Sequence, residues 1–197
     1  MNSIYKTAIK YFNNKQYNNA FDEFLKLNLF YECGYCKFIQ GDVSSAKRYW
    51  ESCKDESPAL DWGVGLLSLV NLTVPQNLSF FQIRNFLERD MQLLFENRQF
   101  KMVENILSAA DIIAEFNPEA YKFIGRVLLN NGYIDLAGEF LEKSKDIYYG
   151  DCEIHYLLAQ YYLLKNDGKS AIKILKKSLS INSEYFPAKN LLQKLMV

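Results

Sequence analysis

The chain of 197 residues is poor in the residues that break regular structure and in those that catalyse reactions. It contains only 9 glycines, 4 prolines and a single histidine, His155. Because glycine and proline are the usual breakers of helices and strands, long stretches of the chain can stay regular. One histidine leaves at most one candidate for a Ser-His-Asp triad, and no G-x-x-x-x-G-K-S/T phosphate loop is present. The sequence therefore predicts a protein that is not an enzyme.

The chain also lacks an excess of charge and a long apolar run. Lys+Arg and Asp+Glu both number 23, whereas proteins that bind nucleic acid usually carry a basic excess, so nucleic acid is not expected as a partner. The most apolar window, residues 62–72, is much shorter than the roughly 20 residues of a membrane span. The N-terminal residues lack the apolar core of a secretory signal. We expect a cytoplasmic protein in a bacterial-type cytosol, with reduced thiols.

Apolar residues recur at three- and four-residue steps along most of the chain, and strand-like alternation is rare. In residues 104–116, for example, Ile106, Ala110 and Ile113 fall on one face of a helix. The pattern predicts an all-α fold of about twelve antiparallel helices joined by short turns. A longer break at residues 72–79, which contains Pro75, is the expected linker or hinge.

Two segments near the C-terminus, 117–148 and 151–182, repeat each other at a spacing of 34 residues. The equivalent pairs are Gly125 and Ala159, Ala137 and Ala171, and Leu141 and Leu175. This period and its small residues, which let helices approach closely, resemble those of the tetratricopeptide repeat (TPR) family. The resemblance implies a TPR-like α-solenoid, a right-handed superhelix of stacked helical hairpins. It is strong over residues 118–185 and looser over the rest of the chain.

The resemblance also divides the chain into parts. The expected parts are degenerate N-terminal hairpins with an extra helix in residues 1–71, a linker at 72–79, TPR-like repeats in 80–183 and a capping helix at 184–197. In the unit that covers residues 84–117, Asp90 stands where the repeat pattern places an apolar residue.

In TPR proteins the first helix of each hairpin faces a concave groove, and the resemblance assigns groove positions to this chain. The residues expected to bind a partner are Tyr5, Phe12, Tyr31, Tyr35, Phe38, Lys122, Arg126, Tyr156 and Gln160. An aromatic N-terminal groove would lead into a partly basic C-terminal one, which suits a peptide or helix with apolar anchors and an acidic end. This predicts an interaction scaffold or adaptor for a partner protein, without a cofactor. Packing of these aromatic rings inside the array remains an open alternative.

The motif Cys33-Gly34-Tyr35-Cys36 offers a chemical alternative, because C-x-x-C occurs in dithiol redox centres and zinc sites. Thioredoxin-like enzymes place this motif after a strand, whereas the residues before Cys33 have a helical pattern, which favours Gly34 as a small packing residue. Cys152 and His155 would complete a set of zinc ligands, but several stacked helices should separate the two pairs. We expect no metal site. A redox or zinc protein and a self-associating module remain alternatives, and homo-oligomerisation is left open.

Overall fold

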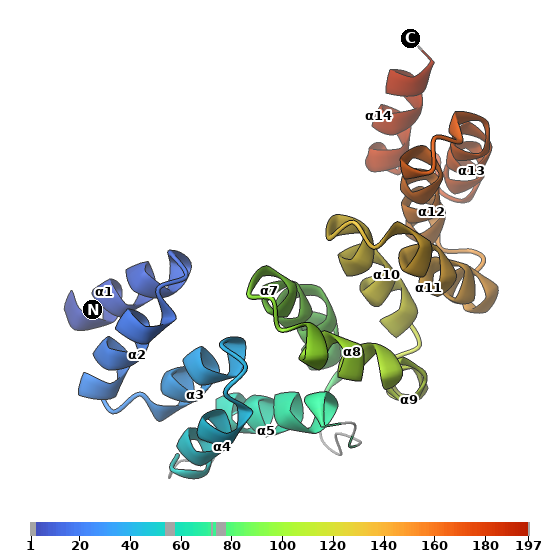
Figure 1. Cartoon of the computed structure of the whole chain (residues 1–197). Helices are drawn as coiled ribbons and strands as arrows, with labels where there is room; N and C mark the ends of the chain where they lie inside the picture. Colours follow the sequence, from blue (N-terminus) through green and yellow to red (C-terminus); the bar gives the residue numbers. More distant parts are fainter. Residues whose placement is uncertain (1–2, 54–57, 72, 74–77, 197) are drawn as a thin grey trace. The chain divides into compact units, whose positions relative to one another are not determined.

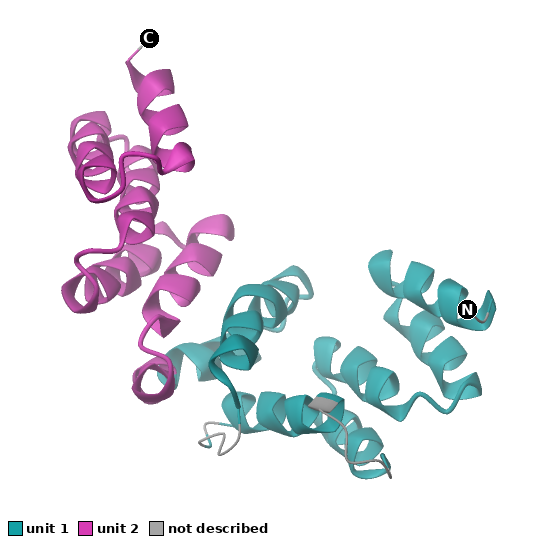
Figure 2. Cartoon of the chain, turned by 180° about the vertical axis from the view of Figure 1, so that it is seen from behind, with its two compact units in different colours: residues 1–109 teal, residues 110–197 magenta. Residues whose placement is uncertain are grey.

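The computed structural model describes residues 3–53, 58–71, 73 and 78–196, which form helices joined by turns (Figure 1). No strand occurs among these residues, so the predicted all-α class is confirmed. None of the helices in this part of the chain is long and apolar enough to cross a membrane. The chain forms two compact units, residues 1–109 and 110–197 (Figure 2). The predicted linker at 72–79 lies within the first unit, and most of it, including Pro75, lies outside the described residues.

The first unit consists of two helical hairpins followed by further helices. The hairpins are α1 (Ser3–Asn13) with α2 (Tyr17–Lys26), and α3 (Phe30–Ile39) with α4 (Val43–Glu51). The predicted extra helix is α5 (Pro58–Val70), which packs against α3, α4 and α8 (Phe100–Ser108). Between α5 and α8 lie α6 (Phe80–Asn85), the π-helical segment η1 (Phe86–Asp90) and α7 (Met91–Glu96), which follow one another directly.

The second unit begins with the short helix α9 and continues with two hairpins and a final helix. Its elements are α9 (Ala110–Phe116), α10 (Ala120–Asn130) with α11 (Ile134–Ile147), α12 (Cys152–Leu164) with α13 (Gly168–Ile181), and α14 (Phe186–Leu195). Helices α11 and α13 begin 34 residues apart and also end 34 residues apart, so the predicted period appears in the structure. This confirms the TPR-like stacking of hairpins.

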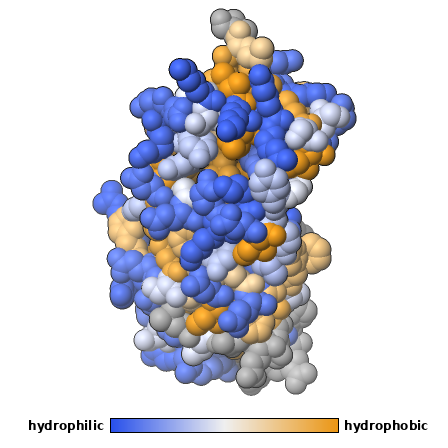
Figure 3. Space-filling model, turned by 90° about the vertical axis from the view of Figure 1, so that its right-hand side faces the viewer, coloured by the Kyte–Doolittle hydropathy of each residue, from blue (hydrophilic) through white to orange (hydrophobic). Residues whose placement is uncertain are grey.

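The helix α14 lies where the sequence predicts a capping helix. Its Ala188 is fully buried together with Ala159, Ala171 and Leu175 of the preceding hairpin. The outer side of the C-terminal end remains partly apolar, since Phe186 is 68% exposed. Figure 3 shows hydrophobic residues at the surface near the top of the view, bordered by hydrophilic ones.

The structure divides the chain into more helices than the sequence predicts, because some breaks leave the apolar pattern intact. The segment 104–116 is not one helix: α8 ends at Ser108 and α9 begins at Ala110. Ile106, Ala110 and Ile113 are nevertheless all buried, as their shared face predicts. A helix break of one residue that keeps the apolar residues buried does not change the hydrophobic periodicity, so the sequence pattern cannot reveal it.

One turn geometry joins successive helices at six places among the described residues. The turn residue has a positive φ, the next residue donates its N–H to the carbonyl five residues before it, and the following helix starts immediately afterwards. The six turn residues are Lys15, Asn28, Gly41, Arg98, Gly132 and Asn166. The sequence indicates a helix end at Gly132, but lysine and arginine give no such signal because they rarely adopt a positive φ.

The side chain of Trp50 lies between two glycines and holds the second hairpin against α5. A Cβ atom on Gly34 would lie 2.4 Å from Nε1 of Trp50, and one on Gly63 would lie 2.6 Å from its Cδ2 atom. The indole is 1% exposed, and its N–H donates to the carbonyl of Tyr31 at 3.0 Å. The predicted packing role of Gly34 is therefore confirmed.

The substitution Gly34→Ala should destabilise the protein, because the added methyl group overlaps the buried ring of Trp50 and forces it to shift. We expect the free energy of unfolding to fall by about 1–3 kcal/mol in urea denaturation. The matched control is Gly168→Ala, where a Cβ atom meets nothing within 4 Å at the start of α13. This control should be neutral or slightly stabilising, and equal losses in both variants would contradict the role of Trp50.

Candidate functional site

A cavity of about 640 Å³ opens within the first unit among α1, α2, α3, α5, α6 and η1. We call it the aromatic cavity, because rings from four helices line it: Phe12, Phe24, Tyr31, Tyr35 and Trp62. Its polar lining includes Glu32, Gln82, Asn85, Arg89 and Asp90. Most of these rings are half-buried, so they combine apolar contact area with access from outside.

Three of the predicted groove residues meet in this cavity. The ring of Phe12 on α1 stacks on that of Tyr35 on α3 with centroids 5.8 Å apart, and Tyr31 stacks on Tyr35 at 6.3 Å. The spacing of the two tyrosines by four residues places both rings on one face of α3. Phe38, in contrast, is fully buried against Trp50, with centroids 5.9 Å apart. The expectation that Phe38 faces a groove is therefore wrong, because its ring belongs to the core.

Asp90 is the most unusual side chain in the cavity lining. It is 2% exposed, and the hydroxyl of Tyr35 donates a hydrogen bond to its Oδ1 atom. Its second oxygen, Oδ2, is buried without a hydrogen-bond partner among the described residues. Burial raises the pKa of this carboxyl group to about 7, although the hydrogen bond from Tyr35 and the charge of Arg89 act in the opposite direction. An unsatisfied buried carboxylate oxygen is costly, and such atoms are rare in folded proteins.

The backbone around Asp90 is also unusual, since Asp90 ends the π-helical segment η1. Widened turns of this kind occur frequently at functional sites. The repeat pattern marks the same position, because Asp90 stands where an apolar residue is expected. The sequence thus marks Asp90 as a polar residue at an apolar position of the repeat, but it does not indicate the contact with Tyr35.

A second cavity of about 440 Å³ continues from the first, and the two share Phe12, Asn13 and Arg89 in their linings. Its other charged residues are Lys15, Glu88 and Glu96. Lys15 and Glu96 form an ion pair with an N–O distance of 2.8 Å. The two linings together hold four carboxyl groups and two cationic groups, so acidic residues predominate along this surface.

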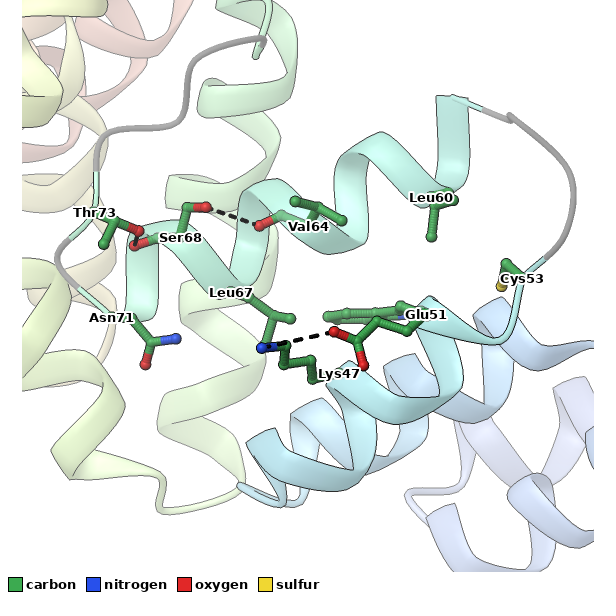
Figure 4. Close-up of a pocket in the computed structure, with 10 residues that line it drawn as sticks. Lys47, Glu51, Cys53, Leu60, Val64, Leu67, Ser68, Asn71 and Thr73 are labelled. Carbon is green, nitrogen blue, oxygen red and sulfur yellow. Dashed lines mark hydrogen bonds and ion pairs between the residues drawn. The ribbon is translucent and has the colours of Figure 1, made fainter.

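A further cavity of about 480 Å³ lies between α4 and α5 (Figure 4). Figure 4 shows Lys47 and Glu51 on the α4 side, joined as an ion pair, and Val64 and Ser68 on the α5 side. The hydroxyl of Ser68 donates to the carbonyl of Val64 at 3.1 Å. Because these polar groups already have partners, the aromatic cavity is the stronger candidate site.

The remaining predicted groove residues are not part of the lining of the aromatic cavity. Tyr5 packs edge-on against Phe24, with centroids 6.2 Å apart, and does not line the aromatic cavity. In the second unit the amide of Gln160 donates to the hydroxyl of Tyr156 at 3.1 Å, and the ring of Tyr156 meets Tyr185 edge-on. A binding role for these three predicted residues stays a prediction.

The two basic residues predicted to bind a partner are engaged within the chain. Lys122 is 5% exposed, and its ammonium group lies 2.8 Å from Asp151, 3.0 Å from Glu119 and 3.4 Å from Glu153. Arg126 pairs with Glu153 at 2.6 Å. The expectation that Lys122 orients an acidic group of a partner is therefore wrong, because its charge is buried and matched by three carboxylates.

The geometry of the cysteines does not support redox or zinc chemistry. Cys33 and Cys36 are fully buried, and burial raises the pKa of each thiol to about 12, which is opposite to the activation of a redox dithiol. No group of three or more metal-ligating side chains occurs in the described part of the chain. His155 is 1% exposed and its Nε2 donates to the carbonyl of Tyr149 at 2.7 Å, as expected of a packed side chain.

Comparisons with known proteins give structural likeness only. No protein-family model matches the chain, and no curated protein sequence matches it. A similar solved structure is YrrB, described as a TPR protein with an unusual peptide-binding site, with a TM-score of 0.46 and 17% identity over 96% of this chain and 90% of that one. Another is the APC/C hetero-tetramer Cut9-Hcn1, with a TM-score of 0.44 and 17% identity. That match covers 98% of this chain and 36% of the other.

The raised pKa of Asp90 predicts a specific pH dependence of stability. The folded state binds the carboxyl proton more tightly than the unfolded state, so Asp90 makes the protein less stable as the pH rises from about 4 to about 7. The variant Asp90→Asn lacks this titration. The difference in the free energy of unfolding, variant minus unmodified protein, should increase by about 2 kcal/mol between about pH 5 and pH 8. Urea denaturation at several pH values measures this difference. A constant difference across this range would contradict the burial of an ionisable Asp90.

The substitution Lys122→Met should strongly destabilise the second unit, because it leaves Asp151, Glu119 and Glu153 clustered without their shared cation. We expect a loss of about 3–5 kcal/mol in the free energy of unfolding. The control Lys165→Met removes an exposed ion pair with Asp135 and should change it by about 0–1 kcal/mol. A loss in Lys122→Met no larger than that of the control would show that Lys122 is accessible to water.

Proposed function

We propose that this all-α chain with TPR-like hairpins is a non-enzymatic scaffold or adaptor that binds a peptide segment of a partner protein in the aromatic cavity. The observation that carries the proposal is an open cavity of about 640 Å³ whose walls are half-buried aromatic rings on rigid helices. Tyrosine and tryptophan are favoured in interfaces because they offer large contact areas with little loss of side-chain entropy. Helices hold such rings in fixed positions, which limits the entropy cost of binding.

The continuity of the two neighbouring cavities favours a peptide over a small molecule. The aromatic cavity and the second cavity share Phe12, Asn13 and Arg89, so one occupant can follow α1 from one to the other. Peptide-binding grooves commonly pair pockets for a few anchor side chains with an open channel between them. Phe12 stands at the junction and would contact the peptide on both sides.

The proposed site is narrower than the groove that the sequence predicts. It keeps Phe12, Tyr31 and Tyr35 and adds Trp62 and Asp90, whereas Lys122 and Phe38 are excluded by their burial. The acidic end of the partner, which the sequence predicts from Lys122 and Arg126, is not part of the proposal, because both residues pair with carboxylates of the same chain. A cytoplasmic location and the lack of a cofactor remain part of the proposal.

Affinity capture with the full chain as bait, followed by mass spectrometry, tests this function. The variant Trp62→Ala removes a ring from the cavity and should reduce recovery of specific partners by about tenfold, which corresponds to 1.4 kcal/mol of binding free energy. The matched control is Phe81→Ala, which removes a 71% exposed ring on α6 outside the cavity lining. If circular dichroism shows both variants folded and both recover the same partners, the cavity is not the binding site.

A further inference from the structure

The aromatic cavity also indicates the chemistry of the group that it accepts, an inference that rests on the proposed function. We infer that the cavity binds a cationic side chain of the partner peptide, lysine or arginine, whose ammonium or guanidinium group donates a hydrogen bond to the free oxygen of Asp90. The peptide would thus be basic at its anchor position. This reverses the acidic peptide that the sequence alone suggests.

The hydrogen bonding of Asp90 supplies the first argument. The hydroxyl of Tyr35 already donates its one proton to Oδ1, so it cannot also donate a hydrogen bond to Oδ2. A buried carboxylate oxygen without a donor loses the solvation that water would give it. A ligand that brings an N–H group with a positive charge supplies both the missing donor and the missing counter-charge.

The aromatic walls supply the second argument. A cation near the face of a tryptophan or tyrosine ring is attracted by the negative potential of the ring, more strongly where water is excluded. Tyr31, Tyr35 and Trp62 all line the cavity that contains Asp90. Lysine and arginine also carry methylene stems, which pack well against such rings while the charged end reaches a polar group.

The surrounding charges supply the third argument. The charged groups that line the cavity are Glu32 on α3, and Arg89 and Asp90 on η1. Arg89 is exposed, so solvent screens its charge far more than that of the buried Asp90. In the adjoining cavity Glu88 pairs with Arg84 and Glu96 pairs with Lys15. In the aromatic cavity the carboxyl groups of Glu32 and Asp90 outnumber the cationic group of Arg89, which favours a basic ligand and opposes an acidic one.

Binding of a cation should be linked to the protonation of Asp90. The bound cation favours the ionised carboxyl group, so a proton must leave before or during binding whenever Asp90 is neutral. Tyr31 and Tyr35, the other titratable groups beside it, stay neutral at physiological pH because burial raises the pKa of each hydroxyl group. Affinity for a cation should therefore strengthen as the pH rises from about 6 to about 8.

The probes for the test are N-acetyl-lysinamide and N-acetyl-norleucinamide, which differ in charge but share an unbranched apolar stem. The readout is the indole N–H signal of Trp62 in NMR titrations of the full chain, with the signal of Trp50 as an internal reference for the buried core. We expect a saturable shift at Trp62 with the lysine probe and a dissociation constant about tenfold higher for the norleucine probe. In the unmodified chain, the affinity for the lysine probe should rise by about tenfold between about pH 6 and pH 8.

Two variants separate the role of Asp90 from net charge. Asp90→Asn should weaken binding of the lysine probe by about tenfold. Asp61→Asn removes the same charge from an exposed position next to Trp62 that does not line the cavity, and should leave the affinity within about twofold. If Asp90→Asn does not fold, the pH dependence of the unmodified chain decides the question.

The outcomes for this inference differ from those for the proposed function. Equal binding of both probes, no saturable shift with the lysine probe, or unchanged affinity in Asp90→Asn would overturn cation recognition. A peptide groove would still stand in those cases if Trp62→Ala loses the captured partners. If Trp62→Ala keeps all partners while the lysine probe binds as expected, the cavity is a cation site and the proposed scaffold function fails.

Discussion

The insertion of Trp50 between two helices is the contact on which the candidate site depends. Its ring fills the space that Gly34 on α3 and Gly63 on α5 leave open, and its N–H is fixed on the carbonyl of Tyr31. Tyr35, which follows Gly34, and Trp62, which precedes Gly63, both line the aromatic cavity. The close packing of the core therefore sets the distance between two walls of the site. Rigid positioning of this kind lowers the entropy lost on binding.

The two units satisfy their buried charges in different ways. In the second unit Lys122 is surrounded by three carboxylates of the same chain, so its charge is neutralised by folding itself. In the first unit Asp90 has one hydrogen bond from Tyr35, and no cation among the described residues that line the cavity is similarly buried. A satisfied network rigidifies a fold, whereas a partly satisfied one leaves free energy that a ligand can recover. This contrast favours the first unit as the place where a partner is recognised.

The sequence predicts most of the fold but only part of the site. The 34-residue period and Gly34 follow from patterns that packing imposes on the chain, so the structure confirms them. The burial of Lys122 could not be predicted, because its partners Asp151 and Glu153 lie a full hairpin away in sequence. Tyr35 and Asp90 are likewise 55 residues apart and meet only through the packing of α3 beside η1. Local periodicity reports which face of a helix is buried, but not which polar groups meet across helices.

The six junctions with a positive φ show how the hairpins are joined with little help from side chains. Lysine, asparagine, arginine and glycine all occupy the same turn position, and the same backbone hydrogen bond closes the turn each time. Such a junction therefore requires a fixed number of residues and a fixed backbone hydrogen bond, but no particular type of residue. Repeats connected in this way can differ in the residue at the turn while the length of the junction and its backbone hydrogen bond stay the same.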